Sequence, residues 1–154
     1  MVKVEMDIVE TLRKCIDKPT QSCCSYTLFN SCVILWHLVV SRIRGVEWLA
    51  TKEICERAGF RNCNEARTCL YRMKKKGLLK TSKLYDRQTI WRINEDILKD
   101  KHMDLRQLKR LLDKYYGMCK EYYKTGVLKK PAKELEEEEE FEEEEWEEEE
   151  WEEE

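Results

Sequence analysis

Thiols and imidazoles are the side chains of this sequence that could bind a metal, attack a substrate or cross-link the chain. There are eight cysteines and two histidines, His37 and His102. The cysteines stand at positions 15, 23, 24, 32, 55, 63, 69 and 119. Structural zinc sites usually show close ligand pairs such as Cys-x-x-Cys, and the sequence has no such pair. We therefore expect no metal site and no cofactor.

Two interpretations of the cysteines remain open. The first is that four of them are small core residues, because each lies on an apolar helical face. These four are Cys32, Cys55, Cys69 and Cys119. The second is that some of the eight form disulfides, which in an intracellular protein would indicate a hyperthermophile or one of its viruses. The 40% share of charged residues fits a thermophilic source.

The sequence lacks the usual patterns of an enzyme. A cysteine nucleophile could pair with His37, but this histidine lies in an apolar run and is typical of a core histidine. The chain has five glycines and no glycine-rich phosphate loop. No Ser/His/Asp spacing stands out. We therefore expect a binding protein rather than an enzyme.

Apolar spacing predicts two helices in the first third of the chain. The first covers residues 5–17 and ends at Pro19. The second begins at a cap on Ser22 or Ser25 and runs to about Arg44. Its apolar residues cover most of the circumference, so we expect it to be central and largely buried. No stretch of 18 apolar residues and no signal-peptide layout is found, which predicts no membrane span and a cytoplasmic protein.

Residues 46–76 predict a short strand followed by two helices. The strand covers residues 46–50, and Thr51 offers an N-cap for a helix that ends at Gly59. Asn62 offers the next N-cap, and Glu65 is placed to complete a capping box. One face of this helix is apolar, and the other is polar and basic. The second face consists of Asn64, Arg67, Thr68, Tyr71, Arg72, Lys74 and Lys75.

The remaining elements are a hairpin and a long helix. Residues 78–84 and 88–94 have β character and are joined by a polar turn. The last helix starts at Asp104, with Gln107 as its capping-box partner. A heptad seam follows, made by Leu105, Leu108, Leu112, Tyr115, Cys119 and Tyr122. The seam could pack on the second helix of its own chain or form the interface of a homodimer, which we favour because Leu111 and Tyr116 add apolar surface beside it.

Charge divides the chain near Pro131. Residues 1–133 hold all 29 Lys and Arg but 15 of the 32 Asp and Glu, a net charge of +14. Residues 134–154 hold 17 glutamates with Leu135, Phe141, Trp146 and Trp151, and such a segment buries too little apolar surface to fold alone. We therefore expect a folded domain over residues 1–130 and a disordered acidic tail over 131–154. The basic body should attract polyanions, with a dependence on salt.

The order helix, short strand, helix, turn, helix, hairpin resembles the winged helix-turn-helix domain of transcription regulators from prokaryotes, archaea and archaeal viruses. The resemblance covers about residues 25–100. It depends most on ATKEICERAGF at 50–60, on the helix at about 63–76, and on MKKKGLL at 73–79. Residues of about 80–92 would form the wing. The resemblance implies a mainly α fold with a small β-hairpin wing, and binding to double-stranded DNA.

A set of DNA contacts follows from this resemblance. Residues near the start of the recognition helix would reach base edges in the major groove, because a helix fits that groove. They are Asn64, Glu65, Arg67 and Thr68, followed by Tyr71. Backbone phosphates would be contacted by the later helix residues and by the wing. These are Arg72, Lys74, Lys75, Lys80, Lys83 and Arg87, and Arg92 also lies in the wing.

Other binding functions compete with this interpretation. Winged helices also serve as protein-interaction modules. Tyr71 with Trp91 could form an aromatic platform for single strands, although for Trp91 we favour a core position, and Tyr71 fits either role. The acidic tail could fold back on the basic body and compete with DNA, which we favour, or bind the transcription machinery. Its aromatic residues recur every five positions, about 500° of helical turn, so they share no helical face.

Overall fold

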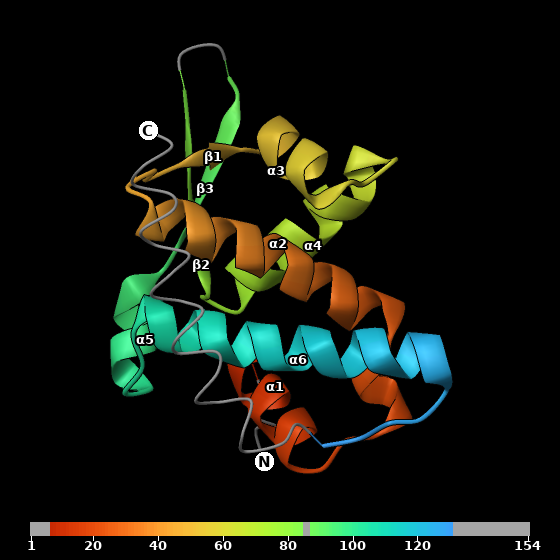
Figure 1. Ribbon diagram of the computed structural model, residues 1–154. Helices are drawn as coiled ribbons and strands as arrows, with labels where there is room; N and C mark the ends of the chain where they lie inside the picture. Colours follow the sequence, from red (N-terminus) through yellow and green to blue (C-terminus); the bar gives the residue numbers. More distant parts are fainter. Residues whose placement is uncertain (1–6, 85–86, 131–154) are drawn as a thin grey trace, which may run out of the picture.

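The computed structural model describes residues 7–84 and 87–130, which form an α+β fold (Figure 1). The helices in this part are α1 (Ile8–Asp17), α2 (Tyr26–Ile43), α3 (Thr51–Ala58), α4 (Cys63–Lys75), α5 (Glu95–Asp100) and α6 (Leu105–Thr125), with a short 3-10 helix, η1 (Gln21–Cys24). The strands are β1 (Leu49–Ala50), β2 (Leu79–Lys83) and β3 (Thr89–Ile93). The expected acidic tail and the tip of the hairpin turn, residues 85–86, lie outside the described residues.

Side-chain N-caps begin the first two α-helices, and the cap of α2 is one of the two serines expected from the sequence. The Asp7 carboxylate accepts a hydrogen bond from the Glu10 backbone N–H at 3.0 Å, which starts α1. Ser25 rather than Ser22 caps α2, and its hydroxyl accepts from the Leu28 N–H at 3.3 Å. Ser22 lies instead within η1, which the sequence did not indicate. Gly45, with φ +95°, follows the end of α2, where the left-handed conformation favours glycine.

Helix α2 is the centre of the core, as its apolar circumference predicts. It packs against α3, α4, α6 and β3, and Figure 1 shows α6 running beside it. Its buried residues include Ile34 and Leu35 at 0% exposure. By length and composition α2 could also cross a membrane, with a mean hydropathy of 1.3 over its 18 residues, but core helices pass the same test.

The heptad seam of α6 faces the interior of its own chain. Leu108, Leu112, Tyr115 and Cys119 are exposed by at most 1%, and α6 packs on α2 and α1. Leu105 and Tyr122, at the two ends of the seam, are partly buried against the same core. The seam therefore packs on helices of its own chain. The expectation that these residues form a dimer interface was wrong. A seam with this spacing looks the same in sequence whether its partner helix belongs to the same chain or to another.

The sheet is antiparallel, with strand order β1-β3-β2. β3 pairs with both neighbours, with Leu49 opposite Trp91 and Leu79 opposite Ile93. The expected hairpin is therefore confirmed, and the β2–β3 ribbon extends beyond the helices (Figure 1).

Thr51 does not cap α3, contrary to the expectation from the sequence. The helix begins one residue earlier, with Ala50 at the N-cap and the Glu53 carboxylate accepting from the Ala50 N–H at 3.2 Å. The Thr51 hydroxyl instead accepts from the Trp91 indole N–H at 2.8 Å and donates to the Thr89 carbonyl at 3.3 Å. Thr51 thereby joins the start of α3 to β3.

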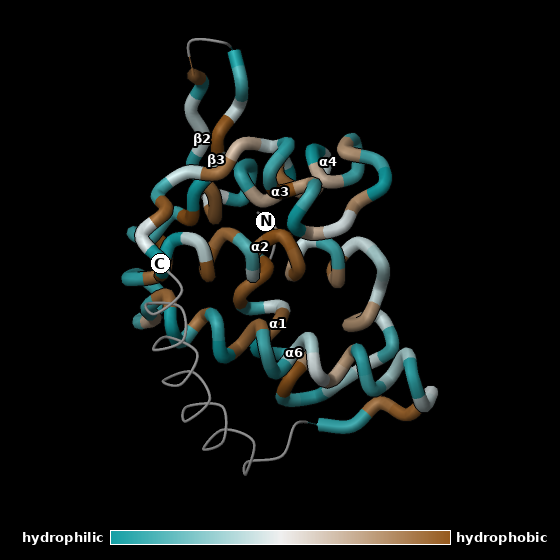
Figure 2. The backbone as a smooth tube through the Cα atoms, turned by 45° about the horizontal axis from the view of Figure 1, so that its top comes forward, coloured by the Kyte–Doolittle hydropathy of each residue, from teal (hydrophilic) through white to brown (hydrophobic). Residues whose placement is uncertain are grey.

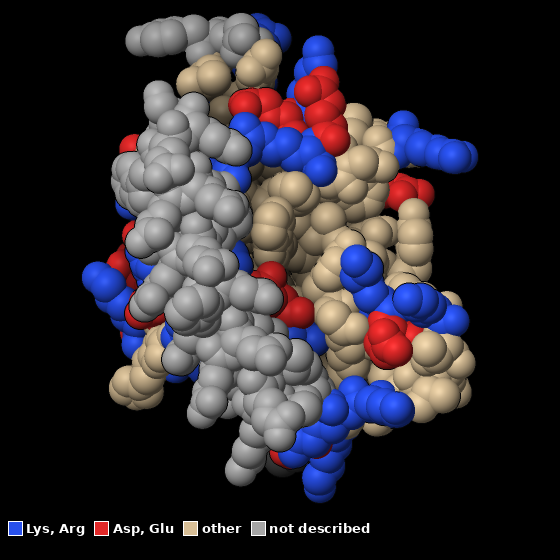
Figure 3. All heavy atoms as spheres, viewed as in Figure 1, with Lys and Arg blue, Asp and Glu red and all other residues tan. Residues whose placement is uncertain are grey.

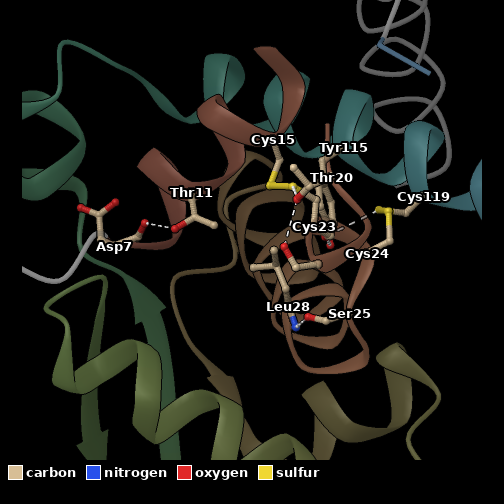
Figure 4. The surroundings of a disulfide bond; sticks show 11 residues. Asp7, Thr11, Cys15, Thr20, Cys23, Cys24, Ser25, Leu28, Tyr115 and Cys119 are labelled. Carbon is tan, nitrogen blue, oxygen red and sulfur yellow. Dashed lines mark hydrogen bonds between the residues drawn. A yellow bond between two sulfur atoms is a disulfide. The ribbon is translucent and has the colours of Figure 1, made fainter. Parts of the chain in front are cut away.

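Six of the eight cysteines form disulfides. Cys15–Cys23 joins α1 to η1, and Cys24–Cys119 joins η1 to α6 (Figure 4). The two adjacent cysteines of η1 thus link this short helix covalently to both α1 and α6. Cys55–Cys63 joins α3 to the first residue of α4. The interpretation as reduced core residues holds for Cys32 and Cys69, which are buried thiols. It was wrong for Cys55 and Cys119, because an apolar helical face also suits a buried disulfide.

Candidate nucleic-acid interface

Helix α4 has one buried face and one solvent-facing polar face. Ala66, Leu70 and Met73 are at most 3% exposed and pack towards α2 and α3. All seven residues of the polar, basic face are exposed, and Glu65 is exposed with them. The face predicted from the sequence is therefore solvent-facing along the length of α4.

The first turn of α4 is held by its cap and by a disulfide. The Asn62 side-chain oxygen accepts from the Asn64 N–H at 2.9 Å, as expected for this N-cap. The Cys55–Cys63 bond then fixes the start of α4 to α3, with the two Cα atoms 5.5 Å apart. The helix is consequently anchored next to Asn64, Arg67 and Thr68, which are expected to reach base edges in the DNA major groove.

Glu65 does not complete a capping box, contrary to expectation. Its carboxylate accepts a hydrogen bond from the Tyr26 hydroxyl at 2.8 Å. Tyr26 begins α2 and is 68% exposed, so this contact adds a second aromatic side chain to the exposed surface near the start of α4. Sequence reasoning missed Tyr26, because its position beside Glu65 arises only when α2 packs on α4.

Asn64 and Arg67 lie in contact on the first two turns of α4. The Arg67 guanidinium donates to the Asn64 side-chain oxygen at 3.1 Å. The Thr68 hydroxyl donates to the Asn64 carbonyl at 2.9 Å. A guanidinium has five N–H donors, so an Arg67 that keeps its bond to Asn64 still has donors to offer a ligand. Arg67 and Asn64 present donors and acceptors from neighbouring positions on one solvent-facing surface.

Tyr71 connects this face to the sheet. Its ring is 46% exposed and meets the Trp91 ring edge to face, with centroids 5.1 Å apart. The Lys74 ammonium lies 5.9 Å from the Tyr71 ring centroid, a cation–π arrangement. Trp91 itself is 0% exposed. It therefore cannot stack on a nucleobase. This confirms the favoured core position of Trp91 and excludes the alternative in which Trp91 forms a platform with Tyr71.

Two of the basic residues of the hairpin lie near its turn. Lys83 and Arg87 are exposed near the turn, and Figure 2 shows this end of the ribbon projecting above α3 and α4. Lys80, nearer the body, pairs with Asp96 at 3.4 Å, and its side chain is 50% exposed.

Arg92 differs from the other basic residues of the hairpin. It pairs with Glu47 and Glu95 and lies over the Trp48 ring, with 19% of its side chain exposed. Its charge is thus already balanced within the body. The other basic residues named for DNA contact, Arg72, Lys74 and Lys75 on α4 with Lys80, Lys83 and Arg87 on the hairpin, are all exposed.

The described residues contain no group of three or more His, Cys, Asp or Glu side chains that could hold a metal ion. The described residues offer instead the exposed polar and basic face of α4 next to the basic hairpin of β2 and β3. Gly77 lies between the two elements. Comparison with protein-family models and with curated proteins finds no match to this chain.

Proposed function

We propose that this protein is a winged helix-turn-helix protein that binds double-stranded DNA sequence-specifically, as a regulator of transcription. In this proposal α3 and α4 form the helix-turn-helix, α4 is the recognition helix, and β2 with β3 forms the wing. The observation that carries the proposal is the solvent-facing polar and basic side of α4, whose opposite face is anchored in the core.

The contacts of α4 divide into two classes. Asn64, Arg67 and Thr68 occupy the first two turns, where a recognition helix meets base edges. Arg67 can pair with guanine in two places, and Asn64 can pair with adenine in the same way. Their mutual hydrogen bond orients both side chains before DNA arrives. Glu65 and Tyr71 would complete the base-contacting set, and Tyr26 would position Glu65 through its hydroxyl.

Phosphate contacts would come from cations further along the surface. Arg72, Lys74 and Lys75 lie on the last turns of α4, and Lys80, Lys83 and Arg87 lie on the hairpin. Charges of this kind set affinity and position without reading sequence. Lys80 would have to exchange its ion pair with Asp96 for a phosphate, so we expect it to contribute less than Lys83.

The test is a pair of alanine substitutions, measured on a panel of duplexes over a series of salt concentrations. Arg67→Ala should relax the sequence preference at one base pair by about 1–3 kcal/mol. Lys74→Ala should weaken binding to all duplexes alike and reduce the slope of log affinity against log salt concentration by about one. Equal losses on every duplex for both variants would contradict base readout by Arg67. No retardation of random duplex at low salt would contradict DNA binding altogether.

A further inference from the structure

A groove lined mainly by aromatic side chains, partly buried on α2 and exposed on α6, lies between these two helices. It is formed by Phe29, Val33 and Trp36 of α2 with Tyr116 and Tyr123 of α6, and we call these five residues the aromatic groove. The Phe29 ring stacks on Tyr116, with centroids 5.3 Å apart, and meets Tyr123 at 5.4 Å. Tyr116 is 40% exposed and Tyr123 is 53% exposed.

The groove is hollowed at its Trp36 end. The hollow has a volume of about 340 Å³ and is lined by Val33, Trp36, His37, Asp113 and Tyr116. All of these residues belong to α2 or α6, so no residue of α4 or of the hairpin lines the hollow. Exposed apolar surface beside a hollow, as Tyr116 and Tyr123 provide here, is typical of a binding surface.

The rim of the groove is basic. Lys120 lies over the Tyr116 ring at 5.3 Å, and Lys124 follows one helical turn later. At the other end, burial and the nearby charges of Arg57 and Arg44 lower the pKa of His37. In Figure 3, uncharged surface on this side of the molecule adjoins several groups of Lys and Arg side chains, with Asp and Glu side chains among them.

The carboxylate that lines the hollow is already balanced. Asp113 accepts hydrogen bonds from the Trp36 indole N–H at 2.9 Å and from the Lys109 ammonium at 2.8 Å. Its charge is therefore paired with Lys109, and the groove combines an apolar floor with a positive rim. A matching ligand would carry aromatic side chains separated by negative charge.

The C-terminal segment of this chain has that chemistry. Residues 134–154 consist of 17 glutamates with Leu135 and three aromatic residues, Phe141, Trp146 and Trp151. We propose that the aromatic groove binds the aromatic residues of segment 134–154 of the same chain, with the glutamates paired to the basic rim. This inference does not depend on DNA binding.

Lengths along the two partners agree. From Asp113 to Tyr123, α6 advances ten residues, or about 15 Å at 1.5 Å per residue. Two aromatic residues five positions apart, such as Phe141 and Trp146, are separated by about 17 Å in an extended chain. Successive aromatic residues of the segment can therefore occupy the Trp36 end and the Tyr123 end of the groove together.

The segment is also long enough to reach the groove. The last described residue, Lys130, pairs with Asp17 at 3.5 Å, which places the start of the segment beside the end of α1. From there, 11 residues to Phe141 span up to about 36 Å, and 21 residues to Trp151 span up to about 70 Å. A folded body of this size has a radius of gyration of about 14 Å, so either aromatic residue can reach the groove.

Charge favours this segment over a second copy of the body. Two copies meeting at the groove would bring Lys120 and Lys124 of each copy into the same interface. The folded body as a whole is strongly positive, whereas segment 134–154 carries a charge of −17. Attraction between the two is long-range at low salt, where the Debye length is about 30 Å.

Photo-cross-linking of the full chain tests the proposal. The photo-reactive residue p-benzoylphenylalanine replaces Trp146, and the protein is irradiated at about 10 mM salt, where screening is weak. We expect cross-links from position 146 to residues of α2 and α6 around the groove, in a product with the mass of one chain. Tyr116→Ala with Tyr123→Ala should lower the yield about fivefold or more, because the aromatic contacts are lost. Tyr71→Ala, on α4, is the matched control and should leave the yield unchanged.

Other outcomes would overturn the proposal. Cross-links to α4 or the hairpin would place the segment on the proposed DNA surface, and a product of twice the mass would make the occupant a second chain. Diffuse or absent cross-linking would show that the groove does not bind the segment. A second variant, Phe141→Ser with Trp146→Ser and Trp151→Ser, leaves the described fold untouched. Its backbone NMR shifts should differ from those of the unsubstituted chain at Tyr116 and Tyr123, and unchanged shifts there would also reject the proposal.

Discussion

Arg87 has a backbone conformation that suits a different residue. Its φ is +67°, in the left-handed region that costs an ordinary L-residue about 1 kcal/mol or more. Its N–H donates to the Leu84 carbonyl at 2.9 Å, which closes the hairpin turn at this residue. The hairpin turn therefore holds a cation at some cost in stability.

Replacing Arg87 by glycine should separate stability from binding. Arg87→Gly relieves the strain and should raise the free energy of unfolding by about 0.5–1 kcal/mol, because glycine adopts positive φ readily. Arg87→Ala keeps the strain and serves as the control. Chemical denaturation compares the three proteins, and a glycine variant no more stable than the alanine variant would show that the turn is not strained.

His37 provides a prediction for pH. Burial first, and then the charges of Arg57 and Arg44, lower its pKa in the folded chain, whereas the unfolded chain keeps a value of about 6.5. The unfolded state therefore takes up a proton before the folded state does. The associated stability is present above pH 6.5 and is lost as pH falls towards the folded pKa, by at most about 1.4 kcal/mol per pH unit.

Measured unfolding free energies from about pH 7 to 5 should show this loss. His37→Gln should have a shallower slope over that range, because glutamine does not titrate. His102→Asn is the control, since His102 is exposed and has φ +56°, a conformation that asparagine tolerates. Parallel slopes for the unsubstituted chain and His37→Gln would mean that His37 titrates alike in both states.

At the scale of elements, hydrophobic periodicity predicted the long helices and the hairpin, but not the contacts that depend on packing. The central position of α2 and the exposed face of α4 follow from the spacing of apolar residues alone. Thr51 shows why local sequence patterns cannot predict such contacts. Its hydroxyl is a good local N-cap, yet in the folded chain it binds Trp91, 40 residues away.

The short elements were also missed. Neither η1 nor α5, with four and six residues, is long enough to display a period. Glu65 has the spacing of a capping box, but Tyr26 of α2 supplies its hydrogen bond. The residues of the candidate interface could therefore be selected from the sequence, whereas their partners could not.

The three disulfides should contribute unequally to the free energy of unfolding. Cys24–Cys119 closes a loop with a sequence separation of 95, whereas Cys15–Cys23 and Cys55–Cys63 each close a separation of 8. In the chain-entropy model, the long loop contributes about 4.5 kcal/mol and each short loop about 2.5 kcal/mol. Replacing Cys24 and Cys119 together by alanine should therefore lower the unfolding free energy most.

Denaturant unfolding under non-reducing conditions measures this order. The double alanine variant at Cys15 and Cys23 is the matched control for the one at Cys55 and Cys63, because their loops are of equal length. A loss at Cys24 and Cys119 no greater than at either short pair would contradict the loop-length argument. If α4 binds DNA as proposed, loss of Cys55–Cys63 should in addition weaken that binding, since the bond anchors the start of α4.

At the scale of the whole molecule, two surfaces share the helix α2. Helix α4, with its outward basic face, packs on one part of α2, while the aromatic groove lies where α2 meets α6. A tail held in the groove keeps 17 negative charges within reach of the basic body. Under the two proposals, the tail would act as a local competitor of DNA without having to cover α4 itself.

Deleting residues 134–154 should therefore tighten binding to random duplex DNA. The effect should be greatest at low salt and should shrink as salt rises, because the Debye length falls from about 30 Å at 10 mM to about 8 Å at 150 mM. The variant with Phe141, Trp146 and Trp151 replaced by serine keeps the full charge of the tail. If attachment to the groove matters, its affinity should lie between those of the intact and the truncated chain. Fluorescence anisotropy with a labelled random duplex measures all three proteins over a salt series, and equal affinities at low salt would mean that the tail does not compete with DNA.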